Sequence, residues 1–212
     1  MKKIVCVLAL ASAALPTAAF AQDGYADEAE EWTAPAEGKA GFRVEARAFY
    51  ERISDPDLDA EIVYEFGEGV GAGVEFGADF AVSETVVIGP YATFDFSSTE
   101  TCEDGLCFAT PGYWAAGIHA GLATGSAGLV YAKLGYGEQE ATLVGTFDDP
   151  DFGVITFDES ETGGGYNFAF GYEHGFGDTI YGRAEIGVSE SYDIYSFDLQ
   201  RGYLGIALGA RF

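Results

Sequence analysis

From Gly41 onward, the chain contains stretches in which apolar residues alternate with small or polar residues at a period of two. This alternation predicts β-strands with two unlike faces, because successive side chains of a strand point to opposite sides. The last twelve residues, 201–212, show it most plainly. The even positions from 204 to 212 are all apolar, whereas the odd positions from 203 to 211 hold small residues, one tyrosine and one arginine. One face of this strand therefore suits hydrocarbon.

Eight segments carry the alternation, and we expect each to be a strand: 41–53, 68–80, 86–96, 113–122, 130–137, 166–173, 180–188 and 201–212. The connections between them are alternately short and long. This rhythm predicts an all-β fold, an eight-stranded antiparallel up-and-down transmembrane β-barrel with short turns at one end and longer loops at the other. The long connection 138–162 is expected to form a projecting hairpin. Pro90 lies mid-strand without a backbone N–H, which predicts a bulge or a local break.

Alternation alone does not decide which face points outward, since a soluble eight-stranded barrel such as a lipocalin would turn its apolar face inward. Glycine, with 30 residues in the chain, is frequent on the second face. Glycine weakens a solvated strand, but it leaves room for large side chains inside a narrow barrel. The apolar face also carries aromatic residues near both ends of the strands, as expected at two membrane interfaces. These features favour the membrane barrel.

The face assigned to the lumen carries charges of both signs. Because an unpaired buried charge is costly, we expect these side chains to pair across the lumen. The four long connections, 54–66, 97–112, 138–162 and 190–198, instead contain nineteen acidic residues and no lysine or arginine. The expected polar residues of the lumen are Arg43, Glu45, Arg47, Glu51, Glu75, Asp79, Asp95, His119, Lys133, Glu173, Arg183, Glu185 and Arg211.

The first 21 residues have the form of a secretory signal peptide. They combine Lys2 and Lys3, an apolar run too short to span a membrane, and an Ala-Phe-Ala cleavage site at 19–21. Residues 22–40 hold six acidic residues and one lysine without an apolar period, so we expect a flexible acidic periplasmic segment. Residues 41–212 would form the barrel in a bacterial outer membrane, with the long loops extracellular.

The chain is strongly acidic. Its formal net charge is −25, and loss of the two signal-peptide lysines leaves −27. Such a chain will not bind nucleic acid through the phosphates. The 48% hydrophobic content argues against disorder for most of the chain, and the lipid-facing strands make outer-membrane lipids and lipopolysaccharide the expected partners. Weak binding of divalent cations at the acidic loops is also physically sensible, although no EF-hand pattern is present.

Two stretches carry a family resemblance: residues 69–98, GVGAGVEFGADFAVSETVVIGPYATFDFSS, and the closing GYLGIALGARF. They resemble the small outer-membrane barrels of the OmpA-like and opacity-type porin family, over about residues 41–212. The resemblance implies insertion by the outer-membrane assembly machinery, which would read the C-terminal strand through Leu204, Ile206, Leu208 and Phe212. It brings over no catalytic residue and no cofactor.

Cys102 and Cys107 are the two cysteines left after the signal peptide, and both lie in a long connection. Four residues separate them, and a secreted chain meets an oxidising compartment, so we expect a disulfide within this loop. Two cysteines without a nearby histidine make a poor zinc site.

Three functions are compatible with this pattern. A structural, surface-exposed barrel with a largely plugged polar lumen and acidic loops is favoured, because eight strands leave a lumen that side chains can fill. A small cation-preferring channel is the alternative. A lipid-modifying enzyme of the outer leaflet would use His119, but it would need a nucleophile beside that histidine, and no serine occupies the neighbouring inward positions. We therefore expect no catalytic or metal site.

Overall fold

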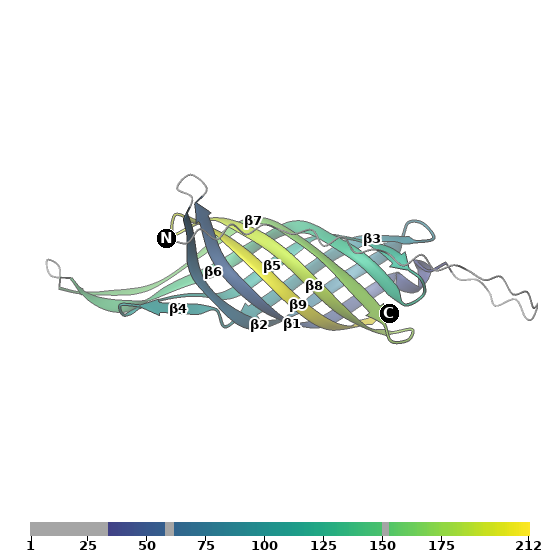
Figure 1. Ribbon diagram of the computed structural model, residues 1–212, viewed down its shortest axis with the longest axis horizontal. Helices are drawn as coiled ribbons and strands as arrows, with labels where there is room; N and C mark the ends of the chain where they lie inside the picture. The colour runs from purple at the N-terminus through teal and green to yellow at the C-terminus, as the bar shows by residue number, and fades with distance from the viewer. Residues whose placement is uncertain (1–33, 58–61, 150–152) are drawn as a thin grey trace, which may run out of the picture. The chain divides into compact units, whose positions relative to one another are not determined.

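The computed structural model describes residues 34–57, 62–149 and 153–212, so the expected signal peptide and residues 22–33 lie outside the described residues. Strands account for most of this part: β1 (Gly41–Asp57), β2 (Ile62–Ala81), β3 (Val86–Ser97), β4 (Glu100–Glu103), β5 (Leu106–Thr124), β6 (Gly128–Asp149), β7 (Gly153–Gly175), β8 (Ile180–Ile194) and β9 (Phe197–Arg211). One short 3₁₀ helix, η1 (Glu37–Lys39), precedes them (Figure 1). No helix in the described part of the chain is long and apolar enough to cross a membrane.

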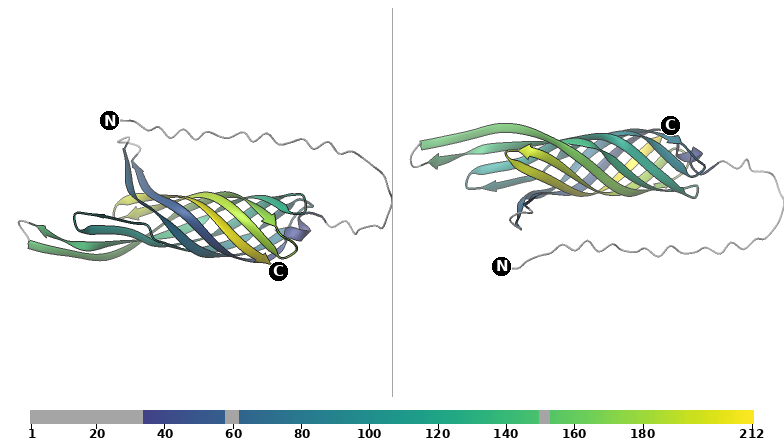
Figure 2. Two further views of the ribbon diagram at one scale, coloured as in Figure 1. Left: turned by 60° about the horizontal axis from the view of Figure 1, so that its bottom comes forward. Right: turned by 90° about the horizontal axis from the view of Figure 1, so that it is seen from above.

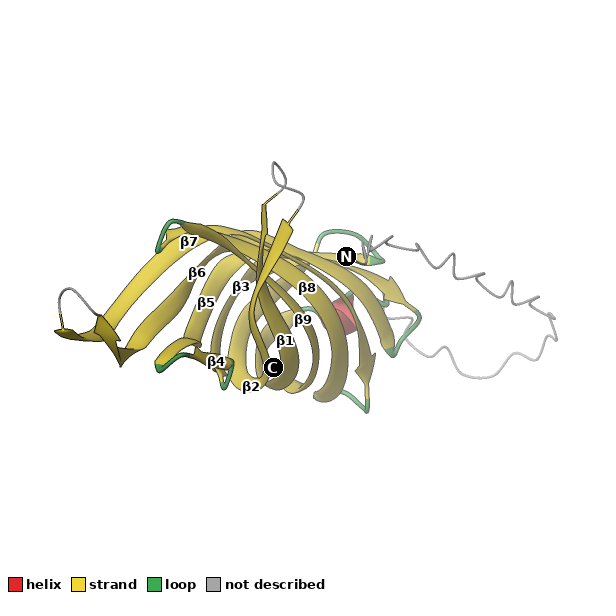
Figure 3. Cartoon of the chain, turned by 60° about the vertical axis from the view of Figure 1, so that its left-hand side comes forward, coloured by secondary structure: helices red, strands yellow, loops and turns green. Residues whose placement is uncertain are grey.

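Eight of the nine strands form a closed antiparallel ring. Each pairs with its neighbours in chain order, β1 closes the ring against β9, and β3 pairs directly with β5. The short β4 pairs with the start of β5 and extends that hairpin beyond the ring. The ribbon views show the tilted strands wrapped around a common axis (Figures 2 and 3). The expected eight-stranded up-and-down barrel is confirmed.

The strands continue well past the segments expected from sequence at the end of the long connections. The expected hairpin at 138–162 is confirmed, because β6 and β7 stay paired up to Asp149 and Gly153. Figure 1 shows this green β6–β7 hairpin reaching farthest from the barrel. The period-2 signal fades there because neither face of a projecting hairpin meets lipid, so alternation is no longer required.

The apolar face of the strands points outward. Phe42 is 71% exposed, Ile206 is 68% exposed and Phe212 is 77% exposed. Trp114 and Tyr136 are also on the outside and pack edge to face with ring centroids 6.1 Å apart. The apolar side chains on this outer face suit lipid rather than water. The backbone suits lipid as well, because a sheet closed on itself leaves no unpaired edge.

Inward-facing rings lie flat against glycines of the neighbouring strand. Tyr203 is the register partner of Gly187, and a Cβ added at Gly187 would lie 2.4 Å from the Tyr203 ring. Tyr181 and Gly209 make the same kind of pair, with a Cβ position 2.3 Å from the ring. The glycines therefore make room for large neighbours inside a narrow barrel.

Substitution of Gly187 by alanine is expected to lower the free energy of unfolding by about 1–3 kcal/mol, because the Tyr203 ring has to leave its place. Equilibrium unfolding in urea, followed in lipid vesicles, measures this change. Gly202 is the matched control, since nothing lies within 4 Å of a Cβ added there. Equal effects of the two alanine substitutions would show that ring packing is not the cause.

Pro90 interrupts pairing on one side without producing a bulge. On the β5 side the register runs unbroken through Pro90 and Ile118. On the β2 side, pairing stops after Gly77–Tyr91 and resumes at Phe80–Ile88 in the same register. The missing N–H thus causes the local break expected from the sequence, while the strand keeps its alignment.

Residues 34–40 are folded against the short-turn end of the barrel, which differs from the flexible segment expected for 22–40. The Ala36 N–H donates to the Glu84 carbonyl at 3.0 Å, and Ala36 is fully buried. The Lys39 amine donates to the Ala127 carbonyl at 2.7 Å. Figure 2 shows η1 at the same end as the C-terminus. The folded unit therefore begins before residue 41.

Candidate functional site

The lumen is the most chemically distinctive part of the described chain. All thirteen residues expected there from sequence are at most 8% exposed, and they come from all eight strands of the ring. The alternation of a strand places them together, because every second residue of each strand points at the barrel axis.

Glu75 on β2 lies at the centre of the lumen. Its Oε1 accepts from Arg43 Nη1 at 2.5 Å, and its Oε2 accepts from Lys133 Nζ at 2.6 Å. Arg47 Nη1 lies 3.5 Å from Oε2, and Arg183 Nη1 lies 3.6 Å from Oε1. One carboxylate thus contacts four cationic side chains from β1, β6 and β8.

Nearer the short turns, Glu173 on β7 plays a similar part. It accepts from Arg211 Nη1 at 2.7 Å and from Arg183 Nη2 at 2.9 Å. Asp79 lies 3.4 Å from Arg211 Nη2 and bonds to His119 Nδ1 at 2.9 Å. These bonds connect β2, β5, β7, β8 and β9 within one network.

Arg201 on β9 belongs to the lumen but was not among the residues expected there. Its Nε donates to Glu51 at 2.5 Å, and its Nη2 donates to Asp95 at 2.9 Å. Thr99 completes the cluster, with its hydroxyl 2.9 Å from Glu51. Position 201 shares the odd numbering of the inward residues of this strand, and that signal could have identified it.

Tyrosines line the charged groups. Tyr131 and Tyr203 each donate a hydrogen bond to Glu185, at 2.9 and 2.7 Å. The Arg183 guanidinium lies 4.5 Å from the centroid of the Tyr131 ring. The rings thus supply donors for the carboxylates and π faces for the cations, which lowers the cost of burying both. A tyrosine in a strand gives no sequence signal for this double role.

The buried charges balance. Seven acidic residues and seven lysines or arginines are buried in the described chain, and His119 is buried among them. The balance includes Lys39, which is 3% exposed and lies 3.5 Å from Glu173. Burial lowers the pKa of the Lys39 amine, and the attraction of Glu173 opposes that shift. Residues 34–40 therefore contribute the cation that makes the lumen neutral.

Apolar clusters lie at both ends of the charged lumen. At the short-turn end, Ala36 packs with Val87, Ala123 and Leu129. Toward the long loops, a second cluster comprises Ile53, Ala141, Ile194 and Leu199, with Phe66, Phe108, Tyr195 and Phe197 packed against it. Between the clusters, the central cavity around Glu75 and Lys133 measures about 10 Å³. A cavity of that size holds about one water molecule.

His119 bonds to Asp79 and lies 5.0 Å from the Tyr131 ring, measured between ring centroids. It is fully buried, and in the described chain its Nε2 has no hydrogen-bond partner. The hydroxyl of a serine or threonine is not among the described partners of His119. The arrangement gives the histidine a structural partner but does not give it a nucleophile.

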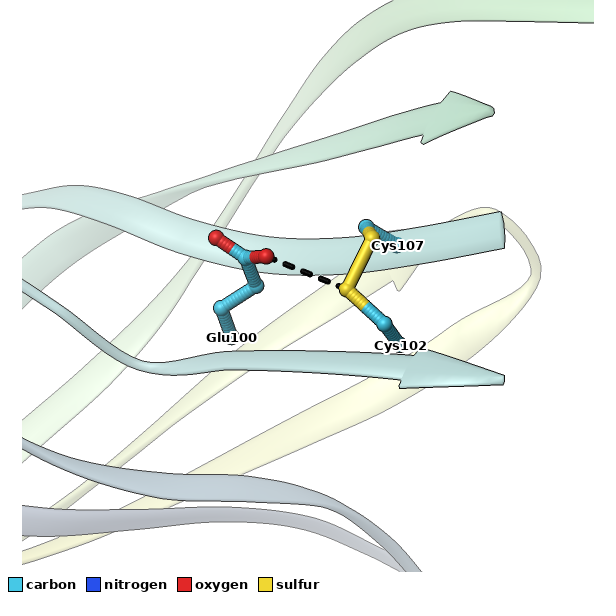
Figure 4. Close-up of a disulfide and its surroundings, with 3 residues drawn as sticks. All are labelled: Glu100, Cys102 and Cys107. Atoms are coloured by element: carbon cyan, nitrogen blue, oxygen red, sulfur yellow. Dashed lines mark hydrogen bonds between the residues drawn. A yellow bond between two sulfur atoms is a disulfide. The ribbon is translucent and has the colours of Figure 1, made fainter. Parts of the chain in front are cut away.

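The expected loop disulfide is confirmed. Cys102 and Cys107 are direct register partners on β4 and β5, and they are joined by an S–S bond (Figure 4). Glu100 Oε1 lies 3.1 Å from the Cys102 sulfur. A disulfide sulfur carries no proton, so this is a contact rather than a donated hydrogen bond. Among the described side chains, these three form the one group of at least three residues with metal-ligating atoms close together, and both sulfurs are already bonded.

Three residues of the expected assembly signal lie on the outer face of β9, and Phe212 follows its last residue. Leu204, Ile206 and Leu208 are 61–68% exposed. The backbone of Phe212 exchanges two hydrogen bonds with Phe42, at 2.8 and 3.0 Å, where β1 meets the C-terminal strand. Their side chains point away from the lumen and form part of the outward apolar band.

Comparison with known proteins identifies the fold. No family model and no curated protein matches the sequence. Among solved structures, Neisserial surface protein A matches with a TM-score of 0.59 and 14% identity, over 82% of this chain and 98% of that one. The attachment invasion locus protein Ail of Yersinia pestis matches with a TM-score of 0.52 and 14% identity, over 82% and 99%. The fold is that of the small eight-stranded outer-membrane β-barrels.

Proposed function

We propose that this protein is a sealed barrel of a bacterial outer membrane that acts as a structural and surface-exposed protein rather than as a pore. The observation that carries the proposal is the lumen itself. Seven buried acidic groups and seven buried basic groups occupy it, and the cavity around Glu75 and Lys133 measures only about 10 Å³. A hydrated ion would have to displace charges that are already paired.

The orientation follows from the chain order. The expected signal peptide delivers the N-terminus to the periplasm, and residues 34–40 pack at the short-turn end. The short turns are therefore periplasmic and the long hairpins extracellular, as in other barrels of this type. The four long connections hold nineteen acidic residues and no lysine or arginine, so this end of the barrel would present an anionic surface.

That surface constrains its partners. One Ail structure is described as a complex with the heparin analogue sucrose octasulfate. A polysulfated ligand needs clustered cations, but the lysines and arginines buried in this chain leave only Arg52 exposed in its described part, where it pairs with Glu65. A polyanion is therefore a poor partner for this chain, and a cationic surface is a better one.

Two other functions are less well supported. An ion channel would need an open path past Glu75 and its four cationic neighbours. An enzyme of the outer leaflet would need a reachable histidine, whereas His119 is fully buried among charged groups.

Conductance separates the sealed barrel from a channel. The refolded mature chain, inserted into planar lipid bilayers in 1 M KCl, is expected to give no resolved single-channel steps. Insertion is verified independently by protease protection of the barrel in vesicles of the same lipid. Regular steps from verified insertions would contradict a sealed lumen and would favour the channel.

A further inference from the structure

A groove of about 210 Å³ lies on the outer wall of the barrel near the long loops. Asp95 and Tyr113 also line it, but both are buried and face the lumen. The lining residues that matter here are Phe94, Phe96, Gly112, Trp114, Glu138 and Glu140. All six stand at even-numbered positions of β3, β5 and β6, the face that points away from the lumen.

Strand register explains why the wall is hollow at this place. Phe96, Gly112 and Glu140 are cross-strand neighbours in one row. Gly112 has no side chain to fill the space between them, and a Cβ added there would lie 3.0 Å from Glu140 Oε2. The β5–β6 register shifts just before Gly112, where Pro111 lacks a backbone N–H.

The groove combines aromatic rings with carboxylates. Trp114 Nε1 donates to Glu138 at 3.1 Å, which fixes both side chains at the rim. Glu140 receives one long bond of 3.4 Å, from the Ser160 hydroxyl, and it is exposed. None of the described residues that line the groove is basic. Aromatic faces and carboxylates together attract an organic cation.

Toward the short turns, the next row of cross-strand neighbours continues the outer, lipid-facing wall of the barrel. Ala92 and Ala116 are register partners there, and both carry small apolar side chains. A ligand with a charged head over Gly112 and an alkyl tail along these alanines would match both surfaces. A phosphate-bearing head group would meet two carboxylates and would be repelled.

We propose that this groove binds a net-cationic amphiphile of the surrounding membrane, with its ammonium group held between Glu138 and Glu140 and its tail in the lipid. The inference rests on the outer wall facing lipid, which is part of the proposed function, but it does not depend on a sealed lumen. Charge complementarity supports this occupant.

Tryptophan fluorescence can test the proposal directly. The chain has two tryptophans, so Trp32→Phe leaves Trp114 as the only reporter. This variant is reconstituted in phosphatidylcholine brominated near the carbonyl end of its acyl chains, which quenches a lipid-facing tryptophan. Dodecylammonium or dodecyl sulfate is then titrated in. An amphiphile that enters the groove displaces brominated lipid and restores the emission.

We expect half-maximal recovery at about a fivefold lower mole fraction of dodecylammonium than of dodecyl sulfate. Glu138→Gln with Glu140→Gln should abolish the difference, and Gly112→Ala should reduce it by narrowing the groove. The matched control is Glu68→Gln with Glu190→Gln. It removes the same charge from two rim carboxylates of which neither lines the groove.

Three results would overturn the proposal. Equal recovery by the two amphiphiles would show that the groove does not select a cation. An equal loss in the Glu68 and Glu190 control would show a response to overall surface charge instead. The absence of any quenching by brominated lipid would contradict the lipid-facing wall and so the proposed membrane location as well, whereas normal quenching with no selectivity would contradict this inference alone.

Discussion

Replacement of Glu75 by glutamine is expected to lower the free energy of unfolding by about 3–5 kcal/mol, because it leaves buried cations without their shared counter-charge. Glu75 is 1% exposed, and its carboxylate contacts Arg43 and Lys133 at 2.5 and 2.6 Å. The amide keeps the size of the side chain but replaces one acceptor oxygen with an NH₂ donor, so the loss includes one hydrogen bond from Arg43 or Lys133 as well as the charge. Urea unfolding of the reconstituted protein measures it.

Two further variants make this result specific. Arg52→Gln breaks the exposed Arg52–Glu65 pair and should cost about 0–1 kcal/mol, as surface ion pairs do. Combining Glu75→Gln with Lys133→Met removes one charge of each sign and should recover part of the loss, which appears as a coupling energy in the double-mutant cycle. If Glu75→Gln cost no more than Arg52→Gln, the lumen charges would be solvated, and a sealed barrel would be contradicted.

The ring of strands was predictable from the sequence because lipid imposes a strict rule on each strand. Every second residue must be apolar where it meets hydrocarbon, so Leu204, Ile206 and Leu208 reveal both the strand and its outward face. The same rule predicted the set of charged residues that share the lumen. Cys102 and Cys107 were predictable for another reason, since spacing and compartment together favour a local disulfide.

No comparable signal indicates which residues pair with each other inside the lumen. Contacts such as Glu75 with Lys133 depend on strand register and on how far each side chain reaches, and alternation specifies neither. The projecting β6–β7 hairpin was predicted, but alternation did not show how far its strands run, because a hairpin with water on both sides does not need a period of two. Residues 34–40, with one proline, one acidic residue and one basic residue, close the acidic stretch 22–40. The single buried Lys39 gave no local hint of its place beneath the barrel.

Lipid contact on the outer face has its own decisive test at Ile206. This residue lies midway along the barrel part of β9, is 68% exposed, and neighbours Ala48 and Ala184 on the adjoining strands. Ile206→Arg is expected to cost about 2–4 kcal/mol in a bilayer, because the guanidinium would sit near the centre of the hydrocarbon. Unfolding from phospholipid vesicles gives the free energy.

Phe80→Arg is the matched control, since Phe80 is also outward and 60% exposed but lies at the short-turn end of β2. An arginine there reaches the interface and should cost about 0–1 kcal/mol. The difference between the two variants isolates depth in the membrane from the general effect of a new charge. A water-soluble barrel would tolerate both arginines equally, because each would lie in solvent. Equal costs would therefore contradict lipid contact on the outer face of the barrel. The charged residues around Glu75 would then need another explanation.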